Sequence, residues 1–473
     1  MYAGLDFGTS NCSIGIMQNN EPSLIPIDEG RTRLSSCLFI EHEVIKPADI
    51  TTPRILEKCE LLGNEQSHSA FSQEALFSIA RKELQREHRQ KAYSFKRAEN
   101  ILDALSANGD VIFGEEAELT HIDDPDSGFY VKSPKSFLGA DINKDQQMVF
   151  TRIVEKMLAH IKQEAESVKD FELRDVVIGR PVNFHRLLGD DGNEQALSII
   201  NEAAKNVGFR HIEFLMEPVA AAYDYERQLQ EDKMVLILDL GGGTTDCSVI
   251  KLGPSYANLG DRSSCILSHT GRRIGGIDLD NKLALMRFMP HFGKGAVFKN
   301  GLPVPGNLFR QAVSVNDVSA QRDFALIRTG REIDDYCIRS SDQRLKRFKT
   351  LRDGKFGLRV SRSAEQAKID LSDYTSVRIP MYYIEPDFDI AVTRDELAES
   401  IADELGKFGV LMRDAIQQAG VQPDVLYVTG GTAMSPVVQQ WIDGVFPGMP
   451  IVVGDQFGSV TSGLVTQAER LFR

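Results

Sequence analysis

The sequence predicts an α/β protein made of two related halves. Short apolar runs with the character of buried strands alternate with segments of helical periodicity along the 473 residues, and this alternation is typical of α/β folds. A segment at residues 5–13 recurs in altered form at residues 238–248. A duplicated motif indicates two related halves that face each other across a cleft. At about 150 residues per domain, the length suits about three domains or two large lobes.

The individual elements follow from local patterns. Buried strands are predicted at residues 3–7, 176–179, 234–240 and 425–429. Helices are predicted at residues 146–168, 194–207, 218–228, 394–418 and 436–445, where apolar side chains recur with the helical period. Strands and helices therefore alternate in both halves of the chain.

Two segments are predicted to interrupt this pattern. Residues 71–105 are highly charged and predict a long helix or a pair of helices. Their basic residues form either a solvated helix face or a docking patch for a protein partner: Arg86, Arg89, Lys91, Lys96 and Arg97. The Gly- and Pro-rich residues 293–306 predict a loop inserted into the second half.

Composition excludes several classes of function. Apolar residues make up 42% of the chain and charged residues 26%, which suits a protein with a sizeable core. The net charge of −14 should repel nucleic acid and anionic membranes over most of the surface, so we expect neither as a partner. Any polyanionic ligand must then be held locally, by backbone N–H groups, a metal ion or a few cations.

The sequence also bears on location. No apolar run approaches the roughly 20 residues of a membrane helix, and the N-terminus opens into strand-like sequence without the cationic region of a signal peptide. The six cysteines, at positions 12, 37, 59, 247, 265 and 337, form no CxxC pair. We therefore expect a cytoplasmic, monomeric protein with reduced thiols.

The repeated segment reads as a hairpin in both copies. LDFGTSNCS at residues 5–13 and LDLGGGTTDCS at residues 238–248 each predict a strand, a Gly/Thr turn and a second strand. With two extra glycines allowed in the second copy, the matched residues are Asp6 with Asp239, Gly8 with Gly241, Thr9 and Ser10 with Thr244 and Thr245, Cys12 with Cys247, and Ser13 with Ser248.

The turn of such a hairpin can hold phosphate oxygens. Its N–H groups and hydroxyls form a small anion cradle without net positive charge. Asp6 and Asp239 end the first strand of each copy, where a hydrated Mg²⁺ on a polyphosphate would lie, because Mg²⁺ keeps several waters and accepts one or two carboxylates. One hairpin alone is equally an ordinary turn. Two matched copies favour a clamp for the phosphates of a nucleotide.

Three further segments fit that clamp. Glu217 precedes a helix that starts with proline, where the carboxylate either faces the site or only caps the helix. Residues 428–436 predict a strand, a glycine turn and a Ser-capped helix, which is either a ligand-facing turn or an ordinary strand–helix connection. Residues 271–278 predict a third glycine turn before a helix, which is able to face phosphate.

Taken in order, these motifs resemble a known superfamily. LDFGTSNCS, VVIGRPVNF, MEPVAAA, LDLGGGTTDCS, RIGGIDLD, SAEQAKIDLS and VTGGTAMSP follow the order used by the actin-like ATPases. Specifically, they resemble the nucleotide-binding part of the seventy-kilodalton heat-shock chaperones, and EGRTRLSS and SPKSFLG resemble further segments of that family. The closest resemblance is to its short bacterial YegD-type members. The resemblance implies two actin-like lobes, each ribonuclease H-like, around a central nucleotide cleft.

The resemblance also implies a role for individual residues at the phosphates. The first phosphate hairpin comprises Asp6, Gly8, Thr9, Ser10 and Asn11, and the second comprises Gly241, Gly242, Gly243, Thr244, Thr245 and Asp246. Lys135 in SPKSFLG matches the lysine that reaches the γ-phosphate and the attacking water. Pro181 matches a proline that relays the nucleotide state, and Glu217 matches its acidic partner beside the Mg²⁺ shell.

Further residues are implied at the nucleoside. Those that match the family's phosphate-contacting turn, ribose- and adenine-contacting helix and adenosine turn are Gly275, Gly276 and Asp278; Glu365, Lys368 and Ser372; and Gly430, Gly431 and Thr432. Ile369 and Met434 stand where the family has arginines that flank the adenine, so we expect Met434 to cover the ring in place of a cation.

Two other departures from the family pattern matter. GRPVNF at residues 179–184 replaces the family's VPAYF and the arginine that soon follows it. The sequence ends at Arg473, one helix after residues 455–461. We therefore expect the apolar linker, the β-sandwich peptide-binding domain and the helical lid of the family to be absent.

The function predicted is that of a chaperone-like ATPase that binds Mg²⁺ and ATP or ADP. The catalytic residues would be Lys135, Glu217, Asp239, Thr244 and Asp246, and Asp6 and Asp239 would hold Mg²⁺ through water. The predicted domains are a first lobe at 1–228 with a helical insertion at about 54–110, a second lobe at 229–454 with a loop insertion at about 293–330, and a C-terminal helix at 455–473 that returns to the first lobe.

Two other functions are compatible with the same motifs. Kinases of the same superfamily that phosphorylate a sugar or a similar small molecule also open with an Asp-x-Gly-Thr hairpin, although no separate base on a substrate loop is evident in this sequence. A non-enzymatic filament former or a nucleotide-gated binding module, with residues 71–105 as its docking face, is the third possibility.

Overall fold

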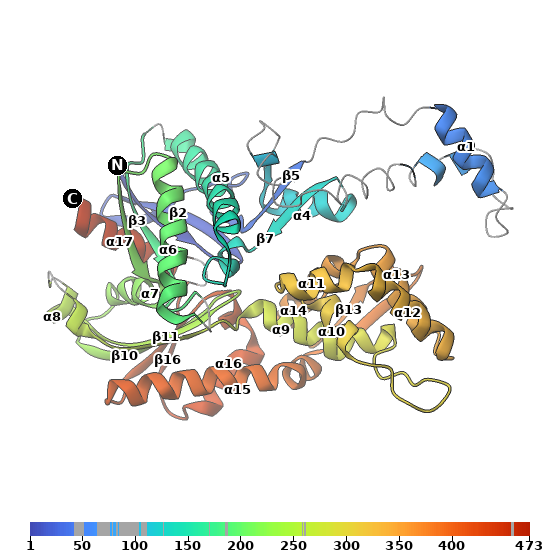
Figure 1. Cartoon of the computed structure of the whole chain (residues 1–473). Coiled ribbons are helices and arrows are strands. Elements are labelled where there is room, and N and C mark those ends of the chain that lie inside the picture. The colour runs from blue at the N-terminus through green and yellow to red at the C-terminus, as the bar shows by residue number, and fades with distance from the viewer. Residues whose placement is uncertain are drawn as a thin grey trace. The chain divides into compact units, whose positions relative to one another are not determined.

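The computed structural model describes residues 1–41, 52–63, 76–77, 79–81, 84, 104–105, 111–125, 127–169, 171–184, 188–257, 259, 262–455 and 458–473 (Figure 1). The chain divides into two compact units. One unit comprises residues 1–36, 132–142 and 154–473, and the other comprises residues 37–131 and 143–153. Both large sheets lie in the first unit.

The first sheet begins with the N-terminal hairpin. Its strands are β1 (Tyr2–Phe7), β2 (Asn11–Gln18), β3 (Glu21–Leu24), β8 (Asp175–Arg180) and β9 (His211–Met216), in the order β3-β2-β1-β8-β9, and β4 (Leu34–Ser35) pairs with β2. The β1–β2 and β2–β3 pairs are antiparallel, whereas β1–β8 and β8–β9 are parallel.

The second sheet repeats this arrangement. Its strands are β10 (Lys233–Leu240), β11 (Thr245–Leu252), β12 (Ile266–Arg272), β15 (Val425–Thr429) and β16 (Ile451–Val453), in the order β12-β11-β10-β15-β16. Again an antiparallel meander precedes two parallel strands. The duplication seen in the two hairpins therefore extends to the whole sheet, and the predicted α/β class with two related halves is confirmed.

The predicted helices are also present. They are α5 (Lys144–Lys169), α6 (Gly189–Asn206), α7 (Glu217–Glu226), α15 (Arg394–Ala419) and α16 (Pro436–Val445). The ends of α15 illustrate why: Thr393 Oγ1 accepts the Glu396 N–H at 3.2 Å, and Gly420 closes the helix with a left-handed φ of 66°. In Figure 1, α15 and α16 (orange to red) lie together beside the second sheet.

Apolar clusters bury both faces of the second sheet. Leu236 and Leu238 of β10 belong to the largest cluster, which also contains Phe408 of α15. Ile237, on the opposite face of the strand, packs in a cluster with Val219 of α7. Burial on both faces explains why β10 reads as an unbroken apolar run rather than as an alternating strand.

The C-terminal helix, α17 (Ser459–Phe472), packs against β1 and α7. Close approach requires glycine here: a Cβ on Gly463 would overlap the backbone of Ala220, and one on Gly4 would overlap the backbone of Val465. The helix is also tied to β2, since Ser13 Oγ and Thr461 Oγ1 lie 2.6 Å apart, both buried. This helix therefore packs tightly on elements of the first sheet.

Residues 284–353 add helices that the sequence analysis did not foresee, and helices at residues 307–313 and 318–325 lie within the segment 293–330 that was predicted to be a loop insertion. α9 (Gly276–Leu283) continues as a π-helical turn at Ala284–Phe288 and a 3₁₀ turn at Met289–Phe292, and the predicted loop follows it. After the loop come α10 (Asn307–Val313), α11 (Val318–Ala325), α12 (Ile327–Arg339), α13 (Arg344–Asp353), α14 (Gly357–Asp373) and the hairpin of β13 (Ser376–Pro380) and β14 (Asp389–Thr393).

The second unit is smaller. It contains the sheet β6-β5-β7, formed by β5 (Cys37–Glu41), β6 (Val111–Phe113) and β7 (Gly128–Lys132), together with α1 (Thr52–Gly63) and α4 (Gly114–Asp123). Most of the predicted helical segment 71–105, including its five basic residues, lies outside the described residues. None of the described helices combines the length and the apolar character needed to cross a bilayer.

Candidate functional site

The turns of the two repeated hairpins lie against each other. A Cβ on Gly242 would overlap Ser10 Oγ, and a Cβ on Gly243 would overlap the side chain of Thr9. The second turn is closed by the Gly241 N–H, which donates to the Thr244 carbonyl at 3.0 Å. The structure therefore brings together the two turns that the sequence matched as copies, although they are more than 200 residues apart.

The third glycine turn is bonded to the second hairpin. The Gly276 N–H donates to the Gly241 carbonyl at 3.0 Å, and the Ile277 N–H donates to the Gly242 carbonyl at 2.8 Å. The Asp278 carboxylate accepts the Gly275 N–H at 2.9 Å. These N–H groups are engaged within the protein, so the turn fixes the second hairpin in place at the start of α9.

The α14 helix and the glycine turn after β15 both lie close to Gly276. A Cβ on Gly276 would lie 2.8 Å from Thr432 Oγ1 and 3.4 Å from Lys368 Nζ. Gly430, with φ of 91°, lies so close to the Leu240 carbonyl that a Cβ would overlap it. Residues predicted at the nucleoside from three separate segments are therefore neighbours.

Side chains on α14 present a common face. Glu365, Lys368 and Ser372 are spaced three and four residues apart and are all half-buried. Ile369 and Met434, which stand in place of arginines, are 51% and 41% exposed. Both apolar side chains are thus accessible at the protein surface.

Sequence reasoning missed Asp280. Its buried carboxylate pairs with Lys368 Nζ at 2.8 Å. Burial raises the pKa of Asp280 to about 6, against the opposing charge of Lys368. The available signal was a second Asp two residues after Asp278 in RIGGIDLD. Side chains at i and i+2 of a helix point in different directions, so Asp280 must have a neighbour other than that of Asp278.

Lys135 and Glu217 form a buried ion pair. The Lys135 ammonium donates to Glu217 Oε1, and the two residues are 4% and 7% exposed. Lys135 lies in a 3₁₀ turn (Pro134–Phe137) and Glu217 opens α7. A Cβ on Gly179 would lie 3.4 Å from Glu217 Cγ and 3.6 Å from Asp6 Oδ1. Glu217 and Asp6, near the end of β1, therefore both lie close to Gly179 of β8.

Burial and mutual repulsion hold the carboxyl groups near Lys135 away from their usual titration range. Burial, reinforced by Glu217, raises the pKa of Asp6 to about 7. Burial and the charge of Glu217 raise the pKa of Asp246 to about 8, and the pKa of Asp239 lies well above its usual range for the same reasons. Burial lowers the pKa of Lys135, but Glu217 and Asp6 outweigh it and the pKa is raised. The site thus has an excess of carboxylates over cations.

Asp246 receives hydrogen bonds from both halves of the first unit. Its Oδ1 accepts the Val182 N–H at 3.1 Å, and the Thr244 side chain also bonds to it. Val182 and Pro181 directly follow β8, whereas Asp246 is the second residue of β11 and pairs with Asp239 of β10. The predicted relay proline therefore lies next to a residue that holds Asp246.

The donor set determines which ions could be held. Among the residues that the structure describes, no group of three or more His, Cys, Asp or Glu side chains is arranged to hold a metal ion directly. Asp6, Glu217 and Asp246 nonetheless act on Asp239 as neighbouring negative charges, with Lys135 opposing them. Such a set of buried carboxylates fits a cation that keeps most of its waters.

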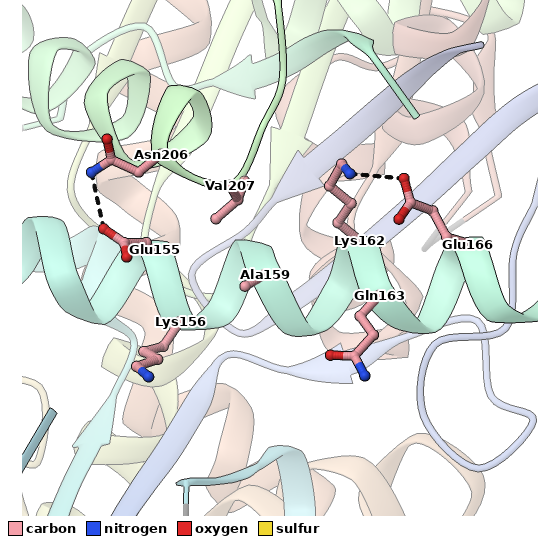
Figure 2. Close-up of a pocket in the computed structure, with 8 residues that line it drawn as sticks. All are labelled: Glu155, Lys156, Ala159, Lys162, Gln163, Glu166, Asn206 and Val207. Carbon is pink, nitrogen blue, oxygen red and sulfur yellow. Dashed lines mark hydrogen bonds and ion pairs between the residues drawn. The ribbon is translucent and has the colours of Figure 1, made fainter. Parts of the chain in front are cut away.

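A separate groove of about 340 Å³ lies between α5 and α6 (Figure 2). The Asn206 amide donates to Glu155 at 3.0 Å, and Lys162 pairs with Glu166 at 2.8 Å. The other lining residues are Lys156, Ala159, Gln163 and Val207. None of the predicted site residues lines this groove.

The chain matches the model of a known protein family. A protein-family model described as Hsp70 protein matches residues 130–294 and 330–471. The matched segments include Lys135, Glu217, the second hairpin, α14 and the glycine turn after β15. The first hairpin precedes them, and residues 295–329 fall between them.

Proposed function

The chain belongs to the Hsp70 family, and from that premise we propose that it binds ATP with Mg²⁺ and hydrolyses it to ADP and phosphate. The observation that carries the proposal is the buried Lys135–Glu217 pair, set among carboxylates beside two touching glycine–hydroxyl turns. Burying several carboxylates with a single lysine is costly, and a bound cation would lower that cost. In a protein with a net charge of −14, the arrangement therefore favours a ligand that completes it.

The two hairpins would bind the phosphates. Turns of this kind offer N–H groups and the hydroxyls of Thr9, Ser10 and Thr244, which can meet phosphate oxygens without bringing full positive charges. Direct contact between the turns supports a single binding site rather than two.

Asp6 and Asp239 would hold Mg²⁺ through its water shell. When bound, the ion would neutralise charge on the phosphate oxygens. The fit rests on the excess of buried carboxylates, because protonation or a cation must relieve their repulsion. The absence of a direct three-ligand set among the described residues is in keeping with an ion held mainly by water and phosphate.

Lys135 and Asp246 would act on the reacting groups. Lys135, held by Glu217, would orient the terminal phosphate and the attacking water. Asp246, held by the Val182 N–H and Thr244, would place that water and accept its proton. Phosphoryl transfer depends mainly on such positioning and on charge stabilisation.

The nucleoside would lie between α14 and the turn after β15. Glu365, Lys368 and Ser372 would face the ribose and the adenine, with Gly430, Gly431 and Thr432 on the other side. This assignment is supported by the proximity of Lys368 and Thr432 to Gly276. Met434 would cover the adenine face.

We extend the proposal to the domains. The lobes would comprise residues 1–228 and 229–454, with insertions at about 54–110 and 293–330, and residues 455–473 would return to the first lobe. The matched strand order of the two sheets and the packing of α17 on β1 and α7 support this division.

Phosphate release by the purified full chain tests the proposal. Release should require both ATP and Mg²⁺, and Lys135→Met should lower kcat by about a hundredfold or more while ATP still binds. Lys346→Met, on the exposed side of α13, is the matched control and should leave turnover unchanged. Turnover that survives EDTA or Lys135→Met would contradict the proposal. Consumption of ATP only when a sugar-type metabolite is added would favour the kinase.

A further inference from the structure

The first turn of α6 contacts two loops that lead to the site. A Cβ on Gly192 would lie 2.7 Å from the Gly139 carbonyl oxygen, so the helix backbone sits directly on the loop that follows Lys135. Two amide side chains, Asn193 and Gln195, extend from the next turn of the helix. Both are half-buried, whereas Glu194 between them is exposed.

Gln195 ties α6 to the Lys135 loop. Its Nε2 donates to the Leu138 carbonyl at 2.7 Å and to the Ala140 carbonyl at 2.9 Å. The Leu138 N–H in turn bonds back to the Lys135 carbonyl at 3.4 Å. The two N–H donors of the amide bond both carbonyls at once, so an apolar side chain at this position would leave the carbonyls without this donor.

Asn193 ties the same helix to the loop that holds Asp246. Its Oδ1 accepts the Phe184 N–H at 2.9 Å, and its Nδ2 lies 3.5 Å from the Val182 carbonyl. The N–H of Val182 is the donor to Asp246 Oδ1. A change at Asn193 would therefore reach Asp246 through a single backbone residue.

We propose that Asn193 and Gln195 are positioning residues, which fix the Lys135 loop and the Val182 loop against one helix so that Lys135 and Asp246 approach the same reacting group. The proposal rests on the proposed ATPase activity for its catalytic consequence. The structural part of the proposal, that Gln195 holds Lys135 in place, is independent of that activity. Misplacement of a reacting group by about 1 Å costs on the order of a hundredfold in rate, which sets the scale of the expected effect.

Steady-state hydrolysis gives the first test. Gln195→Met keeps the length of the side chain but removes its donors, so kcat should fall about 10- to 100-fold. The Kd for ADP with Mg²⁺ should stay within about threefold of wild type, because neither carbonyl belongs to the phosphate hairpins. Gln163→Met, an exposed glutamine on α5, is the matched control and should leave both constants unchanged.

A double variant separates positioning from general loosening. In a Lys135→Met background, Gln195→Met should cause no further loss of kcat, because the group that Gln195 positions is already absent. An equal loss in both backgrounds would overturn the proposal, since Gln195 would then act independently of Lys135.

Lysine labelling provides a readout that does not need ATP. With an amine-acylating reagent followed by mass spectrometry, Lys135 should react at least about fivefold faster in Gln195→Met than in wild type, whereas Lys368, itself paired with Asp280, should not change. If the wild-type protein hydrolyses no ATP but Lys135 is still labelled faster in Gln195→Met than in wild type, the proposed function is refuted and the positioning role stands. Unchanged labelling together with unchanged kcat would overturn the inference.

A milder variant, Gln195→Asn, keeps the test possible if Gln195→Met does not fold. If Lys368 becomes as reactive as Lys135, Gln195→Met has unfolded, and Gln195→Asn replaces it. This variant keeps the amide but shortens it by one methylene group, so it cannot reach both carbonyls. The same changes in kcat and labelling are expected, and wild-type values for both would overturn the proposal.

Discussion

Two buried clusters of charged residues differ in how their charges balance. In the arginine cluster (buried Tyr223, Glu226 and Arg262, with Arg470 at its exposed edge), the Arg262 guanidinium donates to both Glu226 oxygens, at 2.7 and 2.6 Å. The Gly253 N–H adds a third bond to Glu226. Arg262 and Arg470 also lie over the Tyr223 ring, 4.3 and 5.0 Å from its centroid. Every charge of this cluster faces an opposite charge or an aromatic ring.

The carboxylate cluster of the candidate site (Asp6, Glu217, Asp239 and Asp246, with Lys135) lacks this balance. Lys135 pairs with Glu217, while the remaining carboxyl groups repel one another and have raised pKa values. A balanced buried cluster joins α7, α17 and the β11–β12 connection without a ligand, whereas an unbalanced one is completed only by protons or a cation. The imbalance, rather than burial of charge as such, distinguishes the carboxylate cluster of the candidate site from the arginine cluster.

Breaking the balanced cluster should have the largest effect on stability. Glu226→Gln leaves Arg262 buried without its counter-charge and should lower the free energy of unfolding by about 3–5 kcal/mol. Urea denaturation measures this loss. Asp389→Asn, which breaks the exposed pair with Arg378, is the control and should cost no more than about 1 kcal/mol. A comparable small loss for both variants would show that the arginine cluster is not structural.

In the carboxylate cluster, the main expected effect is on activity rather than on stability. Asp246→Asn should cut ATP hydrolysis by about a hundredfold or more, because the group that places and deprotonates water is lost. ATP should still bind, as measured by calorimetry. Unchanged turnover of the purified variant would remove Asp246 from the mechanism.

The two clusters should also differ in their response to pH. The folded-state pKa of Asp246, about 8, lies above its unfolded value of 3.8, so the folded protein binds the proton more tightly. Stability from this group is present in full below about pH 4 and is lost as the pH rises toward 8, by about 1.4 kcal/mol per pH unit. Unfolding of the ligand-free protein between pH 6 and 8 should therefore show a shallower decline for Asp246→Asn. Equal slopes in both proteins would contradict this expectation.

The smallest effect concerns the adenine face. Met434→Arg would replace a sulfur–aromatic contact of about 0.3–1.5 kcal/mol with a cation–π contact of about 0.5–2 kcal/mol. A gain of about 1 kcal/mol corresponds to roughly fivefold tighter binding of ATP or ADP by calorimetry. Equal or weaker binding by a folded variant would mean that Met434 packs under the turn and does not face the purine.

Local patterns in the sequence were sufficient for the elements and for the duplication. The apolar run of β10, the capping residues of α15 and the two Asp–Gly–Thr turns are each encoded within a few residues. The helices of residues 307–353 were missed for two reasons. α10 and α11 have only 7 and 8 residues and lie in a segment that was predicted to be a loop insertion. α12 has 13 residues and a clear amphipathic period, so it carried a signal that was overlooked. The π-helical turn after α9 has no local signal that we recognised.

The sequence by itself therefore determined the α/β class and the two matched hairpins, because strand and helix periods and turn chemistry act over short distances along the chain. Candidate site residues such as Lys135 and Lys368 came instead from the resemblance of longer motifs to a known family. Only the tertiary structure decided which charges face one another. Glu226 with Arg262, Lys135 with Glu217 and Lys368 with Asp280 are separated by 36, 82 and 88 residues. Desolvation and Coulomb interactions depend on distance in space, so neither the balance of each cluster nor the support that α6 gives to Lys135 and Asp246 could be read from sequence spacing.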